Sequence, residues 1–325
     1  MSQRPVALAS ATTGALFLVA VASLALGAIN LSLPDAWAGL TSDSTSFSHT
    51  VVWEIRLPRL LDAMVAGAAL AVAGALIQDA TRNPLADPTL LGITPAAGLV
   101  GAAVAVWYPE SPQWTLALAS VAGGLAGAGI MLAASSRGDD SPVQLVLVGV
   151  GLSAFLSAVI VALLSSSRTF LQTSLGFLAG GLYGAEWGEL NTAAPYAVVA
   201  LVGAVVMAGR LNVLVLGDDV ARGLGVNPGR TRMAALVLCG VLTGAAVAIA
   251  GLVSFVGLVC PHIARFLGGN DNRLVIPLTG LVGAVLVSSA DLVARLIIRP
   301  SEIPMGICTA IIGAPFLVYL VRRRR

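Results

Sequence analysis

Charged side chains are scarce in this sequence, and one group of them lies in the stretch Arg56-Leu57-Pro58-Arg59. A guanidinium donates parallel hydrogen bonds to a carboxylate, so paired arginines are suited to contact an acidic partner. Arg59 could instead pair locally with Asp62, three residues further along the same helix. Both interpretations stay open on this stretch alone, and Pro58 fits the first turn of a helix in either case.

A second charged group follows late in the sequence, where Asp291 and Arg295 stand four residues apart. Opposite charges at this spacing lie on one face of a helix and pair there. We therefore expect an ion pair between Asp291 and Arg295. Arg295 and Arg299 would add positive charge to the same side of the protein as Arg56 and Arg59.

The stretch from Leu216 to Pro228 is polar, interrupted by glycine and too short to cross a membrane. Val220 and Leu224 would share one face of a short helix, while Asp219 and Arg222 offer polar contacts. Such a helix can fit into a groove of a partner protein. A plain solvated loop is the alternative on this pattern alone.

The segment from Arg82 to Gly92 contains two prolines that interrupt regular structure. Asn83-Pro84 ends the preceding helix, and Asp87-Pro88 resembles a helix cap followed by a first-turn proline. Irregular backbone beside a membrane span is tolerated where protein buries it or where it lines an aqueous cavity. The segment is therefore either a plain turn or a gate.

No grouping of residues indicates catalysis or metal binding. Cys239, Cys260 and Cys308 each lie in an apolar segment, no C-x-x-C occurs, and His49 and His262 are far apart. We expect buried, unreactive thiols and a structural role for His262, with a proton relay as its alternative. All 18 basic residues are arginine, so the lysine that a P-loop requires is missing and any ATP would be bound by another chain.

The elements that position these residues follow from composition. Of the 325 residues, 57% are hydrophobic and 10% are charged, so a water-soluble globule is excluded. The apolar runs are continuous rather than alternating, which indicates helices and not a barrel. We predict a single all-α polytopic membrane domain over residues 1–325. Its ten spans are expected near 6–29, 57–79, 92–108, 114–134, 143–164, 191–209, 232–250, 252–267, 274–294 and 305–321.

An even number of spans places both ends of the chain on one side of the membrane. With these spans, 13 of the 18 arginines fall on the side of the chain ends and five fall on the other. Arginine accumulates on the cytoplasmic side, so both termini are expected to be cytoplasmic. The segment 5–29 also resembles a signal peptide, but its apolar stretch is too long, and an uncleaved first span is expected.

Two spans carry stripes of small residues, at i, i+4 and i+8. Such stripes arise from tight helix packing, and a smooth wall along a wide pore is the alternative. The stripes consist of Gly149, Ser153 and Ser157 in the fifth span and Gly306, Ala310 and Ala314 in the tenth.

In this order and spacing, the stretches together resemble the FecCD-type (type II) permease subunits of ABC importers for iron–siderophores, haem and vitamin B12. The similarity runs from about Val52 to Val321. It is carried by RLPR, GAALAVAGALIQ, RNPLADPTLLG, LGDDVARGLG, FVGLVCPHIARFLGG and EIPMGICTAIIGAPFLVYL.

The resemblance implies a subunit that is not itself catalytic, in the inner (plasma) membrane of a prokaryote. It implies a second permease subunit (the same chain or a related one), two cytoplasmic ATPases that bind ATP and Mg²⁺, and an external binding protein. No cofactor or metal in this chain and no nucleic-acid partner are expected. The expected solute is a ferric siderophore, with haem and cobalamin as alternatives.

By position, the resemblance also assigns roles to residues. The predicted sites are binding-protein docking at Arg56, Arg59 and Arg295; ATPase coupling at Asp218, Asp219, Val220, Arg222, Leu224, Gly225 and Val226; an inner gate at Asn83 and Leu85; and pathway lining by both small-residue stripes. The loop 135–143 departs from the family pattern and receives no gate residue.

An ion-coupled secondary transporter is the alternative from another functional class. It would require carboxylates inside the membrane to hold the coupling ion. Asp62, Asp79 and Asp291 lie near the ends of their spans, which fits that mechanism poorly.

Overall fold

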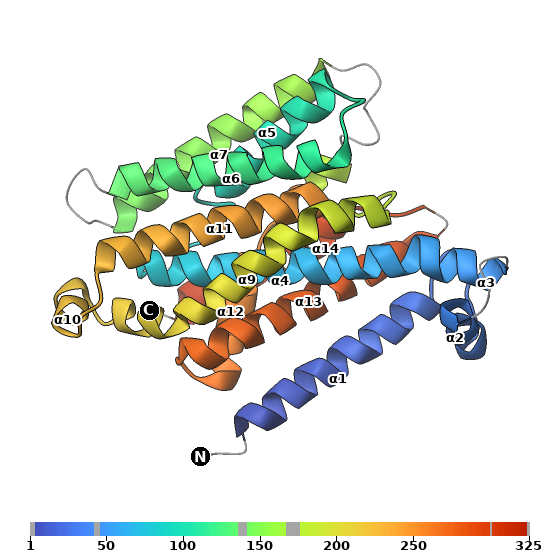
Figure 1. Cartoon of the computed structure of the whole chain (residues 1–325), viewed down its shortest axis with the longest axis horizontal. Coiled ribbons are helices and arrows are strands. Elements are labelled where there is room, and N and C mark those ends of the chain that lie inside the picture. The colour runs from blue at the N-terminus through green and yellow to red at the C-terminus, as the bar shows by residue number, and fades with distance from the viewer. Residues whose placement is uncertain (1–3, 42–45, 136–141, 167–175, 300, 324–325) are drawn as a thin grey trace.

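A computed structural model describes residues 4–41, 46–135, 142–166, 176–299 and 301–323 of the chain (Figure 1). Every regular element in these ranges is helical, which confirms the predicted fold class. The helices are α1 (Arg4–Ala25), α2 (Leu33–Thr41), α3 (Phe47–His49), η1 (Thr50–Arg56), α4 (Leu57–Thr81), α5 (Ile93–Trp107), α6 (Gln113–Ser135), α7 (Pro142–Ser165), α9 (Trp187–Val215), α10 (Asp218–Gly223), α11 (Pro228–Ala250), α12 (Val256–Gly268), α13 (Asn272–Ile297) and α14 (Met305–Arg323).

A helix lies in each of the ten ranges where the sequence predicts a span. Among the residues that the structure describes, seven helical stretches are long and apolar enough to cross a membrane. The other three, in α5, α12 and α14, are apolar but shorter within the described residues. The predicted loop over 30–56 is itself largely helical, because α3 and η1 run directly into α4.

Helix α4 is the centre of the bundle. Most of its residues are buried, and it packs against α9, α11, α12 and α13. Its crossings with α12 and α13 bring backbones together at glycines: a Cβ on Gly74 would lie 1.9 Å from the carbonyl oxygen of Gly257, and one on Gly67 would lie 2.3 Å from that of Gly283. Such contacts are how membrane helices gain packing energy.

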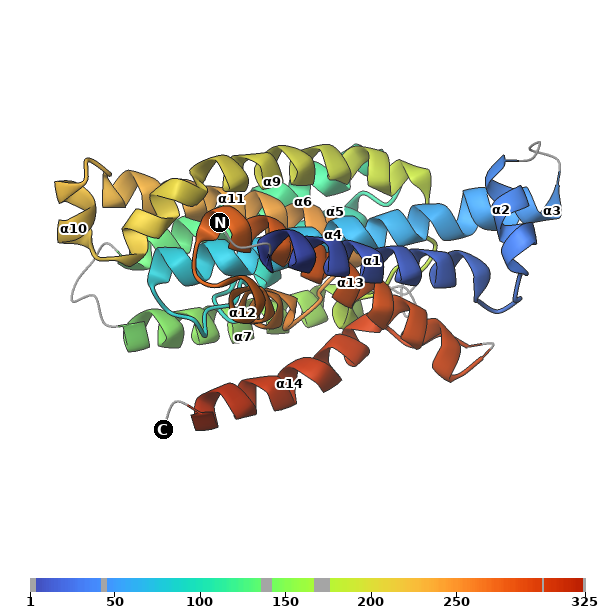
Figure 2. The same cartoon turned by 90° about the horizontal axis from the view of Figure 1, so that it is seen from below.

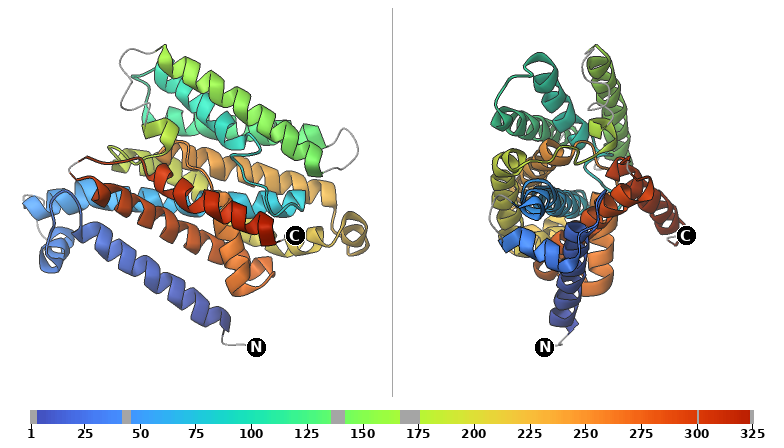
Figure 3. Two further views of the ribbon diagram at one scale, coloured as in Figure 1. Left: turned by 180° about the vertical axis from the view of Figure 1, so that it is seen from behind. Right: turned by 90° about the vertical axis from the view of Figure 1, so that its right-hand side faces the viewer.

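The remaining helices form two groups around this centre. Helices α5, α6 and α7 pack together and reach the centre mainly through the α6–α11 contact, whereas α1 packs on α13 at the opposite edge (Figure 1). Helix α14 contacts α12 and α13 and extends away from the bundle (Figures 2 and 3). We call the end of the bundle that carries α10 the α10 end, and the opposite one the α2 end. The first residues of α1 and the last of α14 both point toward the α10 end.

The helix in the predicted span 252–267 begins later than expected: α11 ends at Ala250, and α12 starts only at Val256. Gly251 has a φ of 65°, which breaks the helix. The backbone amide of Leu252 donates to the Phe177 carbonyl at 2.9 Å, and that of Gly181 donates to Ala250 at 3.0 Å. The break is thus hydrogen-bonded to the segment 176–181, which an apolar sequence does not reveal.

Candidate functional site

Helix α10 is the predicted loop helix, and the structure confirms that it is helical. Gly217, with a φ of 121°, and Gly225, with a φ of 78°, permit the turns at its two ends. Asn227 then accepts a hydrogen bond from the Arg230 amide at 3.0 Å and caps α11. The helix is therefore a defined projection between α9 and α11 rather than a solvated loop.

The apolar residues of this projection face outward. Val220 is 47% exposed and Leu224 is 62% exposed, whereas Ala221 is buried against the bundle. Asp219 pairs with Arg222 within the helix, at 3.0 Å and in full contact with solvent. Uncovered apolar side chains on so short a helix fit a surface that another protein covers.

Asp218 differs from its neighbour because it faces the bundle. Its carboxylate forms ion pairs with Arg82, which follows α4, and with Arg232 of α11, the latter at 3.3 Å. Asp218 is therefore anchored inside the chain, whereas the sequence grouped it with the residues that contact a partner.

The turn that follows α4 carries the predicted gate residues Asn83 and Leu85. The Asn83 side chain accepts a hydrogen bond from the Leu85 amide at 3.0 Å, and both residues are half-buried. The expected helix start at Asp87-Pro88 is wrong, because α5 begins at Ile93. The Asp87 carboxylate instead accepts from the Thr89 amide at 2.8 Å, and it lies against Gly257 in the first turn of α12.

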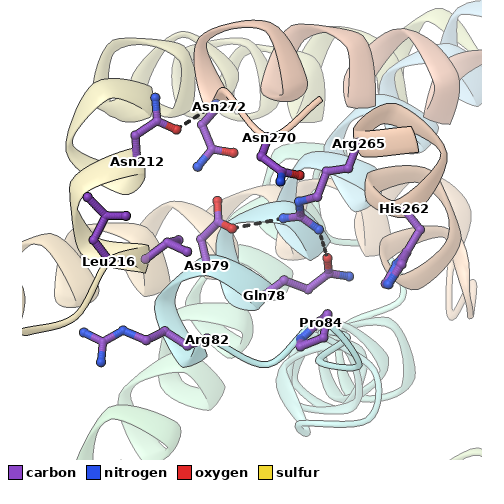
Figure 4. Close-up of a pocket in the computed structure, with 11 residues that line it drawn as sticks. Gln78, Asp79, Arg82, Pro84, Asn212, Leu216, His262, Arg265, Asn270 and Asn272 are labelled. Atoms are coloured by element: carbon purple, nitrogen blue, oxygen red, sulfur yellow. Dashed lines mark hydrogen bonds and ion pairs between the residues drawn. The ribbon is translucent and has the colours of Figure 1, made fainter. Parts of the chain in front are cut away.

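A polar cavity of about 750 Å³ opens beside this turn, between the ends of α4, α9, α12 and α13 (Figure 4). Arg265 donates to Gln78 at 2.5 Å and to Asp79 at 3.0 Å across it. Gln78 in turn donates to the Gly257 carbonyl at 3.1 Å. Sequence reasoning missed this cavity; its one signal was a set of polar residues at the ends of three apolar helices.

Hydrogen bonds among two asparagines and one aspartate connect the ends of α9 and α13 at the rim of the cavity. Asn212 accepts from the Asn272 amide at 2.8 Å and donates to Asp271 at 2.7 Å. Hydrogen bonds from the Arg273 amide and from Asn212 hold the pKa of Asp271 below its usual range. His262, whose Nδ1 lies 2.8 Å from the Leu258 carbonyl, forms another part of the lining.

The predicted docking arginines lie at the α2 end, but two of them are buried. Arg56 is 6% exposed, and its guanidinium donates to the carbonyls of Leu24 and Ile29. Arg295 is 7% exposed and pairs with Asp291 at 3.0 Å, as predicted. Both guanidiniums are thus engaged within the chain and are not the exposed contacts that the sequence suggested.

Arg59 also lies at this end, and it pairs with two acids that the sequence did not suggest as its partners. It bonds Asp291 at 2.8 Å and Glu302 at 2.8 Å, so the local pair with Asp62 is wrong. Asp62 is fully buried, and neither of its carboxylate oxygens has a hydrogen-bond partner among the described residues. Arg299 remains exposed at this end and donates to Asn30 at 3.3 Å.

The small-residue stripes are largely used for packing. Gly149 lies against Leu91, and the Ser153 hydroxyl donates to the Thr89 carbonyl at 2.7 Å. Gly306 is buried so closely that a Cβ there would lie 1.9 Å from the Ala179 carbonyl oxygen. These three are packing contacts and not an open wall. Ser153, Ser157 and Ala310 are half-buried, and Ala314 is exposed.

The three cysteines are buried, as expected. The loop 135–143, which the sequence left unassigned, falls mostly outside the described residues.

Comparison with known proteins gives concordant matches along the chain. Residues 15–323 match the FecCD transport family. The chain is 38% identical to the iron(3+)-hydroxamate import system permease protein FhuB of Bacillus subtilis (strain 168), over 95% of this chain and 81% of that protein. It is 40% identical to the Fe(3+) dicitrate transport system permease protein FecD of Escherichia coli (strain K12), over 94% and 97%.

A solved structure of a metal-chelate type ABC transporter in an inward-facing conformation has the same fold. The TM-score is 0.83 at 30% identity, and the match covers 98% of this chain and 99% of that one.

Proposed function

The chain belongs to the FecCD transport family and is a permease subunit of an ABC importer, and from this premise we propose that its solute is a ferric chelate. The observation that carries the proposal is the match over residues 15–323, together with near full-length relatives named for ferric hydroxamate and ferric dicitrate. A ferric siderophore or ferric citrate is therefore preferred over haem or cobalamin.

The proposed complex contains further chains, which supply functions that this chain lacks. Two cytoplasmic ATPases supply the nucleotide site, with ATP and Mg²⁺, because this chain has no lysine for a P-loop. An external binding protein supplies the solute affinity. A second permease subunit completes the pathway.

The proposed orientation puts the α10 end in the cytoplasm. Arg222, Arg230, Arg232 and Arg273 lie at or near that end, and basic residues accumulate on the cytoplasmic side. Both termini then face the cytoplasm of a prokaryotic cell, and the α2 end faces the binding protein.

In the proposed mechanism, closure of the ATPases on ATP displaces α10 and changes access to the pathway at the α10 end. The proposed contact residues are Val220 and Arg222 of α10, with Asp219 at its exposed edge, and Leu224, Gly225 and Val226 in the turn that follows it. The turn with Asn83 and Leu85 acts as the inner gate. The polar cavity beside it, open at the α10 end, supports an inward-open state of the pathway.

The test is uptake of radioactive iron into liposomes that contain the complete complex, with the loaded binding protein and ATP on their appropriate sides. We expect accumulation of ferric hydroxamate or ferric citrate that requires ATP and is unaffected when ion gradients are collapsed. A complex with the P-loop lysine of the ATPase replaced is the control. Uptake of only haem or cobalamin would overturn the solute, and uptake driven by an ion gradient would overturn the mechanism.

A further inference from the structure

Asp218, the first residue of α10, is held by two arginines that belong to different parts of the bundle. Arg82 follows the last turn of α4, and Arg232 lies in the first turns of α11. Both guanidiniums reach the same carboxylate oxygen of Asp218. All three side chains keep only a quarter to a third of their surface exposed, so water screens these ion pairs less than those of a free surface.

Each of the two arginines also bonds the end of a long helix. The Nε of Arg82 donates to the Leu214 carbonyl at 3.1 Å, in the last turn of α9. The Nε of Arg232 donates to the Ala80 carbonyl at 3.0 Å, in the last turn of α4. Carbonyls in the last turn of a helix have no partner within that helix and carry its negative dipole end, so they favour a cation.

Arg82 links this cluster directly to the gate turn. Its backbone adopts a left-handed conformation (φ 49°, ψ 30°) that is unfavourable for a residue with a side chain, and its side-chain bonds to Leu214 and Asp218 help to hold it there. The next residue is Asn83, whose side chain fixes the Leu85 amide. A displacement of Asp218 is therefore transmitted to the gate turn through the Arg82 side chain and the peptide bond between Arg82 and Asn83.

Asp219, the neighbouring acid, makes none of these connections. Its side chain is 99% exposed and its ion pair with Arg222 stays within α10. Asp218 therefore faces the bundle, whereas the exposed Val220 and Leu224 leave the rest of the helix available to a partner.

We propose that Asp218, with Arg82 and Arg232, is the joint that transmits movement of α10 to the ends of α4 and α9 and to the gate turn, and that Asp218 is not itself a contact for the ATPase. The inference rests on the proposed function and makes Asp218 a positioning residue for transport.

The test uses the complete complex with Asp218→Asn, which removes the charge but keeps the side-chain size. Three quantities are measured: the amount of ATPase that co-purifies, the solute transported per ATP hydrolysed, and hydrogen exchange of residues 82–92 and 218–224 with and without an ATP analogue. We expect the ATPase to co-purify as in wild type, while transport per ATP falls about five- to tenfold. The nucleotide-dependent exchange change in 82–92 should disappear, with 218–224 still protected by the ATPase.

Arg230→Gln is the control, because it removes an exposed charge two residues from Arg232 without touching the joint, and it should behave as wild type. Asp218→Glu, which keeps the charge, should restore at least part of the coupling. Loss of ATPase binding in Asp218→Asn, full coupling in that variant, or equal defects in Asp218→Asn and Arg230→Gln would overturn the proposal. If the ATPase does not protect α10 of the wild-type chain, the proposed function itself fails, which is a separate outcome.

Discussion

Arg59 in α4 bonds both carboxylate oxygens of Asp291 in α13, although the two residues are 232 positions apart in the chain. The Nε of Arg59 lies 3.0 and 3.2 Å from the two oxygens, and one terminal nitrogen lies 2.8 Å from the first. Arg295 approaches the same carboxylate at 3.0 Å from within α13. One buried acid thus pairs with a half-buried and a buried guanidinium at the α2 end and joins the two helices there.

Replacing Asp291 by Asn should destabilise the protein strongly. The substitution leaves Arg59 and Arg295 without their shared counter-charge, and removing one partner of a buried ion pair costs roughly 3–5 kcal/mol. Thermal unfolding of the purified chain in detergent measures this. Arg222→Gln, which breaks a solvated pair, should hardly change the melting temperature. Equal melting temperatures of the two variants would contradict the structural role of the ion pairs around Asp291.

A methyl group at Gly74 should separate α4 from α12. The added Cβ would lie 1.9 Å from the Gly257 carbonyl oxygen, a backbone atom that cannot move away without shifting a helix. Overpacking of this kind costs roughly 1–3 kcal/mol, so Gly74→Ala should lower the yield and melting temperature of the chain. Gly280→Ala is the control, because its Cβ would meet the side chains of Val72 and Ala68 at ordinary contact distances of 3.6 and 3.9 Å. A Gly74→Ala protein as stable as this control would refute the close crossing.

Leu224→Asp should uncouple the proposed ATPase from transport. The side chain is exposed on the outer face of α10, so a charge there disturbs a partner rather than the fold. We expect normal melting of the purified chain together with loss of solute-stimulated ATP hydrolysis in liposomes. Leu224→Met, which keeps an apolar contact, should retain stimulation. Normal stimulation with Asp at this position would reject α10 as the coupling surface.

Charge reversal at two arginines of the α2 end should have different effects: on docking at Arg299 and on folding at Arg56. Arg299 is exposed, so Arg299→Glu should weaken association with the binding protein, and more so at low salt, where charges are screened least. Binding measured at two salt concentrations tests this. Arg56→Glu should instead reduce the amount of folded protein, since Arg56 is buried against two carbonyls. Unchanged docking of Arg299→Glu at low salt would remove Arg299 from the docking surface.

Local features of this protein were predictable from the sequence, because helix geometry fixes them. Continuous apolar runs predicted where helices lie, and the spacing of Asp291 and Arg295 predicted their ion pair. The partner of Arg59 was not predictable, since Asp62 is three residues away and Asp291 becomes adjacent only after α4 packs on α13.

The same limit applies at the α10 end. The pattern of Val220 and Leu224 predicted a short amphipathic helix. It could not show that Asp218 and Asp219, two adjacent acids, face in opposite directions, because Arg82 reaches Asp218 only across the bundle. The break before α12 was missed for a related reason. Leu252 and Val253 are as apolar as a span, and the irregular backbone is revealed only by the hydrogen bond from the Leu252 amide to the Phe177 carbonyl and that from the Val253 amide to the Gly251 carbonyl.

Helix α12 has 13 residues, which is about 20 Å of helix, whereas the hydrocarbon layer of a bilayer is about 30 Å thick. The polar main chain just before α12 therefore sits at a depth where lipid offers it no hydrogen bonds. The segment 176–181 supplies hydrogen-bond partners to this main chain. The Gly306 amide of α14 in turn donates to the Gly180 carbonyl of that segment at 3.0 Å. Exposing any of these main-chain groups to lipid is costly. We therefore expect residues 251–255, the segment 176–181 and the first turn of α14 to keep their hydrogen bonds and to move together as a rigid unit during transport.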